Sequence, residues 1–138
     1  MINRITHKQF LTLCDHVIEK QVPLKGKPIA IAIADEAGDI VYIVHMDGVP
    51  SRSSIIASGK ARTAAKMGRD TTAIKQLCQD LNTPISDFLV PGLTTLPGGA
   101  PILNKQEDLI GGIGISGMAA SEDQEMANYC AKFLQEIL

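Results

Sequence analysis

The chain has 138 residues with 45% hydrophobic and 20% charged side chains, which is typical of one folded domain and excludes a disordered chain. Its 13 basic and 15 acidic residues are interspersed and leave a net charge of −2, so no broad attraction for nucleic acid or an anionic membrane is expected. The N-terminus lacks a signal-peptide apolar region, no apolar run could span a membrane, and the three cysteines are far apart. We therefore expect a cytoplasmic single domain, residues 1–138, without a disulfide framework or a metal site.

The first predicted element is a helix that runs to about residue 21. Thr6 and Gln9 have the spacing of a capping box, and apolar residues follow at helical intervals: Phe10, Leu13, Cys14, Val17 and Ile18. Pro23 and Gly26 are expected to end the helix. On a helical wheel His16 lies about 130° from the centre of the apolar stripe, so it points away from the helix's own core. It is either a solvated surface side chain or a ligand for a cofactor at a subunit interface.

A β-hairpin is predicted next. Residues 29–34 alternate Ile with Ala, which indicates a strand with one bulky face and one small face. Turn residues 35–38 join it to a second strand, residues 40–46, whose apolar residues occupy both faces. We therefore expect the second strand to be central or buried on both sides. At its end, His45 and Asp47 share a face, and a hydrogen-bonded structural role is favoured there over a ligand role.

Two helices are predicted after the hairpin, over residues 55–67 and from residue 70 or 71 to about 79. The longer one is crowded with small residues, so it can approach the Ala face of the first strand closely. Part of that small-residue surface, or the later Gly-rich strand, is expected to pack against another subunit. Arg62, Lys66 and Arg69 form a basic strip on its other side. This strip is either a solvated face or a clamp for ligand carboxylates.

Residues 82–101 are rich in proline and glycine and form the most irregular segment of the chain. Gly98 and Gly99 lie there between Pro97 and Pro101, which predicts a fixed turn. The backbone amides of this turn have two interpretations. They either line a pocket and donate to an anionic ligand, or they make a tight entry into the next strand.

A second hairpin and a C-terminal helix complete the chain, with strands predicted over residues 101–103 and 109–116. The G-x-G-x-x-G motif at residues 112–117 is not followed by the second strand that a dinucleotide site requires. A Gly-rich strand approached closely by another backbone or by a flat ligand is favoured instead. Ser121 and Gln124 are expected to form the capping box of the last helix. Hairpins separated by helices indicate an α+β domain with a mainly antiparallel sheet.

Together these segments resemble the GlcG/HbpS-like family, which includes the C-terminal domain of PduO-type proteins. The resemblance covers nearly the whole chain and depends on the order and spacing of residues 29–38, His45 to Gly48, Lys60 to Ala65, Pro97 to Ile102, and Gly112 to Gly117 followed by Asp123. It implies a profilin-like antiparallel sheet of about five strands with helices on both sides. It also implies homo-oligomers, haem binding by some members, and pathways that use cobalamin or oxidise glycolate and diols. One departure from many relatives is the longer link from Val22 to Pro28.

Our leading hypothesis from the sequence is a cytoplasmic, homo-oligomeric protein that binds a tetrapyrrole, either haem or a corrinoid. It would be accessory to glycolate, diol, glycerol or cobalamin-linked metabolism. The candidate cofactor-binding residues are His16 as axial ligand, Arg62 and Lys66 for the propionates, and Gly98 and Gly99 as pocket wall.

Two further hypotheses stay open at this point. The first is an accessory enzyme that acts on a small hydroxy acid or diol, with Asp47, Asp123 or His45 as its titratable group. The second is a structural partner of a larger enzyme. The sequence shows no catalytic triad with suitable spacing, so it leaves undecided whether the chain is an enzyme.

Overall fold

The computed structural model describes residues 4–21 and 26–138, and it has nine elements in those ranges. They are α1 (His7–Gln21), β1 (Ala30–Asp35), β2 (Ile40–His45), α2 (Arg52–Met67), α3 (Thr71–Leu81), the 3-10 helix η1 (Ile85–Phe88), β3 (Gly99–Leu103), β4 (Leu109–Ser116) and α4 (Ala120–Ile137). The strands form one sheet in the order β2-β1-β4-β3, and every neighbouring pair is antiparallel. The α+β class and both predicted hairpins are therefore confirmed.

The sheet has four strands in the described residues, not the five that the resemblance implied. No fifth strand flanks β2 or β3 in those ranges, so both strands lie at edges of the sheet. The irregular segment before β3 contributes η1 and turns rather than another strand. Pro23 and most of the longer link between α1 and β1 lie outside the described residues.

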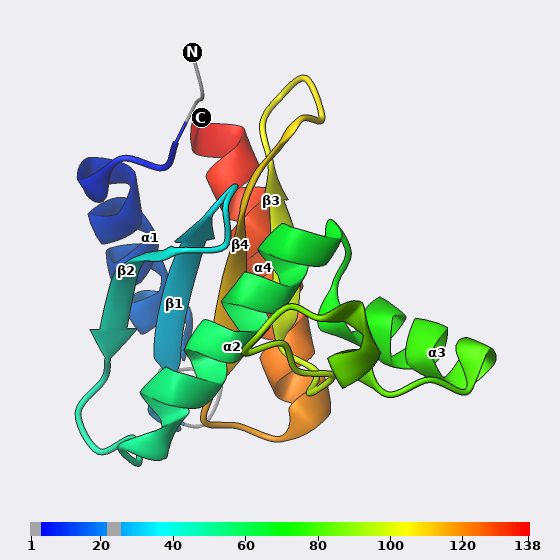
Figure 1. Cartoon of the computed structure of the whole chain (residues 1–138). Helices are drawn as coiled ribbons and strands as arrows, with labels where there is room; N and C mark the ends of the chain where they lie inside the picture. Colours follow the sequence, from blue (N-terminus) through cyan, green and yellow to red (C-terminus); the bar gives the residue numbers. More distant parts are fainter. Residues whose placement is uncertain (1–3, 22–25) are drawn as a thin grey trace.

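Helices cover both faces of the sheet (Figure 1). The alternation of β1 decides which helix meets which face, because Ile31 and Ile33 point to one side and Ala30 and Ala32 to the other. The Ile side packs against α1 and α4 in a core of large side chains that includes Leu13, Val17, Ile113, Ile115 and Leu134. The Ala side packs against small residues of α2, namely Ala57, Ala61 and Ala65.

Glycines in β4 bring the backbone of α2 against the sheet. A Cβ atom on Gly114 would lie 1.9 Å from the carbonyl oxygen of Ala57, and one on Gly112 would lie 2.3 Å from that of Ala61. No side chain fits at either position unless the helix moves away. The predicted close approach to the Gly-rich strand is thus confirmed, and the approaching backbone is that of α2 in the same chain.

The starts of the first and last helices test the two predicted capping boxes. At α1 the box is confirmed, because the amide of Thr6 donates to Gln9 Oε1 at 2.8 Å and the amide of Gln9 donates to Thr6 Oγ1 at 3.1 Å. At α4 the prediction is wrong, because the helix begins at Ala120, before Ser121. Glu122 Oε1 accepts from the amide of Ala119 at 3.3 Å there. Glu122, at the third helical position, therefore plays the part expected of Gln124, and Ala119 stands at the N-cap position expected of Ser121.

The prediction that the second strand is central or buried on both sides is wrong. β2 is an edge strand, and Val41 and Ile43 are 41% and 46% exposed. Tyr42 and Val44 alternate with them and pack against the core under α1 and α4. One face of β2 is thus buried and the other is exposed, although both carry apolar residues.

Candidate functional site

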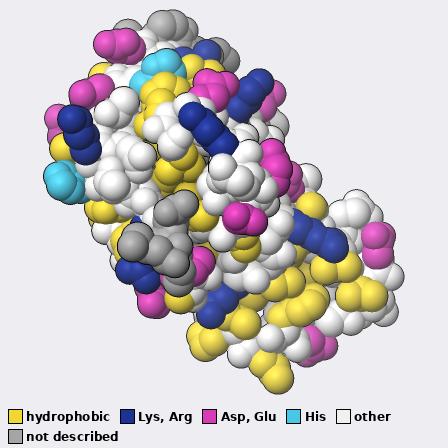
Figure 2. Space-filling view, turned by 90° about the horizontal axis from the view of Figure 1, so that it is seen from above, with side chains coloured by type: hydrophobic (Ala, Val, Ile, Leu, Met, Phe, Trp, Pro, Cys, Tyr) yellow, Lys and Arg dark blue, Asp and Glu magenta, His cyan; other side chains and the backbone are white. Residues whose placement is uncertain are grey.

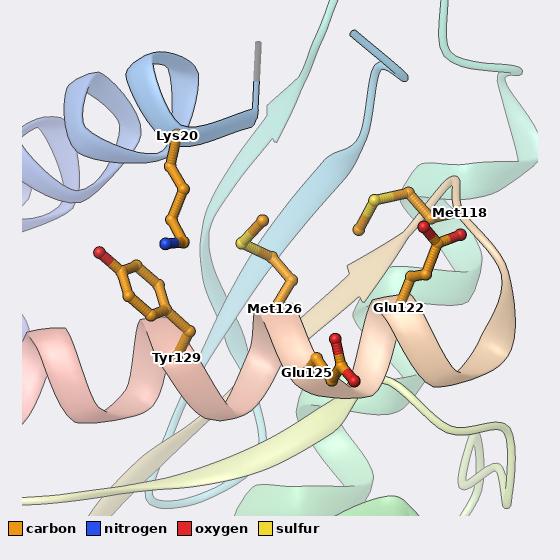
Figure 3. A pocket seen from close by; sticks show the side chains of 6 residues that line it. All are labelled: Lys20, Met118, Glu122, Glu125, Met126 and Tyr129. Carbon is orange, nitrogen blue, oxygen red and sulfur yellow. The ribbon is translucent and has the colours of Figure 1, made fainter. Parts of the chain in front are cut away.

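A pocket of about 330 Å³ lies where the end of α1 faces the first turns of α4. This volume is at the lower end of the range of about 300–1,000 Å³ that small-molecule sites occupy. Figure 3 shows Lys20 reaching from α1 toward the ring of Tyr129, with the thioethers of Met118 and Met126 beside the hollow. Two acidic side chains of α4, Glu122 and Glu125, complete the lining.

His16 is held beside this pocket by side chains of α4. Its Nε2 atom is hydrogen-bonded to Tyr129 Oη, and its ring stacks on that of Phe133 with centroids 4.2 Å apart and planes 9° apart. Its ring is also stacked with that of Tyr129, at 5.5 Å and 6°. The interpretation of His16 as a solvated surface side chain is wrong, because the helical wheel reports only the core side of α1 and not the helix beside it.

Tyr129 is the centre of this arrangement. The ammonium of Lys20, one turn after His16 on α1, lies 4.4 Å from the centroid of the Tyr129 ring. Tyr129 also borders a second pocket, of about 220 Å³, whose lining includes Phe133 and Lys132. We call the surface formed by His16, Lys20, Met126, Tyr129 and Phe133 the α1/α4 groove.

The groove combines groups that suit haem, a flat ring that holds iron and carries carboxylates. Imidazole and phenol are both ligands of haem iron in proteins, and an ammonium can pair with a propionate. Met126 and Phe133 supply apolar surface for a ring. The sequence alone singled out His16 as a candidate, but it did not single out Tyr129 or Phe133 of the last helix. Tyr129 and Phe133 are four residues apart on one helix, as are His16 and Lys20 on another. The two pairs could be matched only by knowing that these helices pack together.

Arg62 and Lys66 lie on α2, on the other face of the sheet from His16. Arg62 Nη1 donates to the carbonyl oxygen of Gly92 at 3.5 Å. The aliphatic part of Lys66 covers Gly38, where an added Cβ would lie 2.8 Å from Lys66 Cε. Within one chain, the structure therefore does not bring these two cations together with His16.

Gly98 and Gly99 are buried, and their backbone amides are used inside the chain. The Gly98 amide donates to Gln124 Oε1 at 2.7 Å, and the Gly99 amide donates to Thr71 Oγ1 at 2.9 Å. An added Cβ on Gly99 would lie 2.6 Å from the carbonyl oxygen of Lys60. Of the two interpretations of this turn, the tight strand entry describes its geometry.

A buried ion pair joins α2 to α4 beneath this turn. Lys60 Nζ lies 3.2 Å from Asp123 Oδ2 and donates to the carbonyl oxygen of Ile115 at 2.7 Å, while Asp123 Oδ1 accepts from the amide of Met118 at 3.0 Å. Burial raises the pKa of Asp123 and lowers the pKa of Lys60, and in each case it outweighs the attraction between the two charges. Asp123, one of the titratable groups considered for an enzyme, is thus enclosed in the fold.

The other two groups considered for an enzyme, His45 and Asp47, are exposed near the end of β2. His45 Nε2 lies 3.2 Å from the carbonyl oxygen of Pro50, which agrees with a structural role. Within residues 4–21 and 26–138, no three His, Cys, Asp or Glu side chains come together as ligands for a metal ion. In the same ranges, no helix has the length and apolar character needed to cross a membrane.

Comparisons with known proteins extend this description. The family model described as haem degrading protein HbpS-like matches residues 5–132. Protein GlcG of Escherichia coli (strain K12) is 32% identical over 88 residues, which are 64% of this chain but only 63% of GlcG.

Solved structures share the fold over nearly the whole chain. Klebsiella pneumoniae protein ORFY has a TM-score of 0.84 at 24% identity and covers 100% of this chain and 94% of its own. The PduOC:heme complex has a TM-score of 0.80 at 25% identity and covers 95% of each chain. HbpS has a TM-score of 0.79 at 21% identity and covers 100% of this chain and 92% of its own.

Proposed function

The chain belongs to the family described as haem degrading protein HbpS-like. On this premise we propose that it binds haem in the α1/α4 groove. The observation that carries the proposal is the contact of both His16 and Lys20 with Tyr129, which lines one pocket together with Lys20. A similar chain, PduOC, has been solved as a haem complex and matches 95% of this one. That similarity supports haem over a corrinoid as the tetrapyrrole.

Each part of the groove has a role in this proposal. The hydrogen-bonded pair of His16 and Tyr129 supplies the iron ligand, and Lys20 pairs with a propionate. Met118 and Met126 would offer thioether contacts to the apolar ring, in a pocket that Glu122 and Glu125 also line. Bound haem supplies an iron centre for oxygen or electron chemistry.

Arg62, Lys66, Gly98 and Gly99 are left outside this site, since they lie in or against the α2 layer. The two cations could approach a haem only if a second copy of the chain brought α2 to the groove. We keep homo-oligomerisation as part of the proposal because Ile55 of α2 is 77% exposed and Leu89, after η1, is 87% exposed. Figure 2 shows apolar side chains gathered on the projecting part of the molecule, on the side where Figure 1 places α3. Sedimentation showing only a 14.8 kDa species at micromolar concentration would contradict this part.

The location and pathway of the protein are also matters of proposal. All three cysteines, at positions 14, 78 and 130, are free, which supports the reducing cytoplasm as the compartment. A role accessory to glycolate, diol, glycerol or cobalamin-linked metabolism is retained from the family resemblance. A strain that lacks the gene, grown with glycolate, a diol or glycerol as carbon source, would test that role.

Haem titration of the purified protein tests the proposal directly. The absorption spectrum after purification without added cofactor is recorded first, and ferric haem is then added in steps. We expect a Soret band that saturates at a fixed haem-to-chain ratio. Nonspecific broadening without saturation would remove the basis of the proposal.

Two matched lysine variants locate the site on one face of the sheet. Lys20→Ala is expected to weaken haem binding because it removes the cation of the groove. Lys66→Ala is expected to leave binding unchanged because Lys66 lies on the opposite helical layer. The reverse result would place the haem against α2, where Arg62 and Lys66 were considered as propionate-binding residues.

A further inference from the structure

A buried ion pair lies behind the pocket of about 330 Å³ and has no part in the haem site as described so far. Lys60 of α2 and Asp123 of α4 pair at 3.2 Å, and their side chains are only 4% and 5% exposed. Resting on the proposed haem site, we infer that this pair fixes the position of Met118, which forms one wall of that pocket. Lys60 and Asp123 are then positioning residues for haem, although neither lines the pocket.

The two carboxylate oxygens of Asp123 serve different partners. Oδ2 faces Lys60 Nζ, whereas Oδ1 accepts a hydrogen bond from the backbone amide of Met118 at 3.0 Å. Lys60 Nζ also donates to the carbonyl oxygen of Ile115 at 2.7 Å. Ile115 lies near the end of β4 and Met118 lies just beyond it, so the pair holds both sides of the point where the chain leaves the sheet for α4.

Gly98 leaves the room that this arrangement needs. A Cβ atom added there would lie 2.8 Å from Lys60 Nζ and 3.0 Å from Asp123 Cβ. It would also lie 2.6 Å from the carbonyl oxygen of Ile115, which accepts from Lys60. The absence of a side chain at Gly98 thus lets the lysine reach both of its acceptors.

Met118 belongs to the short connection between β4 and α4, residues 117–119. Its thioether lines the pocket, and Figure 3 shows it at the end of the hollow away from Lys20 and Tyr129, with Met126 between. A shift of the backbone at Met118 would therefore change how much apolar surface the pocket offers to a flat ring.

Stability alone does not account for a buried pair of this kind. Removing two charges from water costs free energy, so such a pair often stabilises a fold no more than apolar side chains of the same size. What the charged pair adds is direction, because its hydrogen bonds fit one arrangement of donors and acceptors. In this chain that arrangement includes the backbone amide of a pocket wall.

Two double variants separate the positioning role from the stability of the fold. Lys60→Met/Asp123→Asn removes both charges but keeps a side-chain oxygen that can accept from the Met118 amide. Lys60→Met/Asp123→Leu removes both charges and that oxygen as well. Urea denaturation first establishes that each variant is folded under the conditions used. Titration with ferric haem then compares the affinity of each variant with that of the wild type.

Carbon-13 labelling of the methionine methyl groups gives a second readout, in the haem-free protein. The nuclear magnetic resonance signal of Met118 is assigned by its loss in Met118→Leu. Met67 is the internal control, because it ends α2 next to Gly68, which lies by Leu109 at the other end of β4. A change in overall stability would not shift the signal of Met118 alone.

We expect the two double variants to differ at Met118. The variant with Asn at position 123 should keep the wild-type signal of Met118 and bind haem as the wild type does. The variant with Leu there should shift the signal of Met118 but not that of Met67. Its haem affinity should fall about fivefold, which is the order of effect that one hydrogen bond contributes.

Hydrogen exchange of the wild-type protein adds a measurement that does not depend on a variant folding. Haem seated against Met118 should slow exchange in a peptide that covers residues 116–126, measured by mass spectrometry. A peptide that contains Met67 should exchange at the same rate with and without haem. Unchanged exchange of 116–126 in the saturated complex would overturn the inference.

Other outcomes separate this inference from the proposed function. Equal Met118 signals and equal haem affinities in the two double variants would overturn the inference while haem binding still stands. A shifted Met118 signal with unchanged haem affinity would also overturn it, because that wall would then contribute nothing to binding. A wild-type protein without saturable haem binding would overturn the proposed function itself.

Discussion

The two faces of the sheet differ in the size of the side chains that cover them. On the α2 face, alanines of β1 and glycines of β4 meet alanines of the helix, and backbone lies almost against backbone. On the α1/α4 face, isoleucines and leucines hold the helices farther away. Four of the five aromatic residues of the chain also lie on this side: Phe10, Tyr42, Tyr129 and Phe133.

This difference shows how one small sheet can carry one closely packed helical layer and one layer that leaves pockets beside its helices. Small side chains let α2 lie so close that neither a ligand nor a larger residue fits between them. Larger side chains leave irregular space where the helices diverge, and the groove lies there. The stability of the fold should therefore be sensitive to atoms added on the α2 face. Substitutions in the α1/α4 groove should change ligand binding with less effect on stability.

The largest effect should come from adding one methyl group to the α2 face. Gly114→Ala would place a Cβ atom 1.9 Å from the carbonyl oxygen of Ala57, a backbone atom that can move only with the whole helix. We expect a loss of about 5 kcal/mol in the free energy of unfolding, or failure to fold, measured by urea denaturation.

Gly59→Ala is the matched control within α2. Its Cβ atom would meet Gly92 O at 3.4 Å and Thr94 Cγ2 at 3.6 Å, which are ordinary contacts. Alanine also favours helix over glycine, so stability should rise by up to about 1 kcal/mol. Equal losses in the two variants would contradict the close-packing account of this face.

Removal of the buried cation between the layers should have the next largest effect. Lys60→Met leaves the Asp123 carboxylate buried without its partner, and we expect a loss of about 3 to 5 kcal/mol at neutral pH. The exposed Lys66→Met on the same helix should change stability by less than about 0.5 kcal/mol.

The loss in Lys60→Met should also depend on pH, with a sign that follows from Asp123. Burial raises the pKa of Asp123 above its unfolded value, and removal of the Lys60 charge raises that pKa further. Between the unfolded and folded pKa values the folded state binds more protons, so stability of the variant rises as pH falls. The deficit relative to wild type should be smaller at about pH 5 than at about pH 8 in denaturant melts. A deficit that grows toward acid would show that Asp123 is not the buried charge responsible.

A substitution in the groove should affect haem more than stability. Phe133→Leu removes the ring stacked on His16, and we expect a loss of about 1 kcal/mol in unfolding free energy. Haem affinity should fall in the same variant because the imidazole loses the ring that holds it. Phe88→Leu, in η1, is the control and should leave the haem titration curve unchanged. Identical haem curves for wild type and Phe133→Leu would remove Phe133 from the site.

The smallest effect is expected at the outer face of β2. Ile43 is 46% exposed, so Ile43→Thr should change stability by less than about 0.5 kcal/mol. Ile33→Thr, on the neighbouring strand, buries a hydroxyl in the core and should cost about 2 kcal/mol or more. A large loss from Ile43→Thr, measured across protein concentrations, would indicate that another copy covers this face.

Patterns local to one segment were predictable from the sequence. The Ile/Ala alternation of β1, the box of Thr6 and Gln9, and the crowding of small residues in α2 each report a physical requirement of their own segment. The predicted close approach of another backbone at Gly112 and Gly114 is confirmed, because only glycine leaves room for that backbone. The family resemblance added the helices on both sides of the sheet.

Pairings between distant segments were not predictable in the same way. The edge position of β2 depends on where β4 inserts, and nothing within residues 40–46 reports that. His16 was singled out because α1 alone could not explain it, but its partner Tyr129 lies 113 positions away along the chain. Lys60 carried one local signal that was not used, a charged residue among the small, buried side chains of α2.

The alternation of glycine and isoleucine along β4 also limits how the sheet can assemble. If β4 paired one residue out of register during folding, its isoleucines would point into the backbone of α2 and its glycines would leave holes in the opposite core. Such a mispaired sheet could not accept either helical layer. A single-residue insertion or deletion within 109–116 would create the same conflict permanently, whereas the turn at 104–108 lies outside the paired segment.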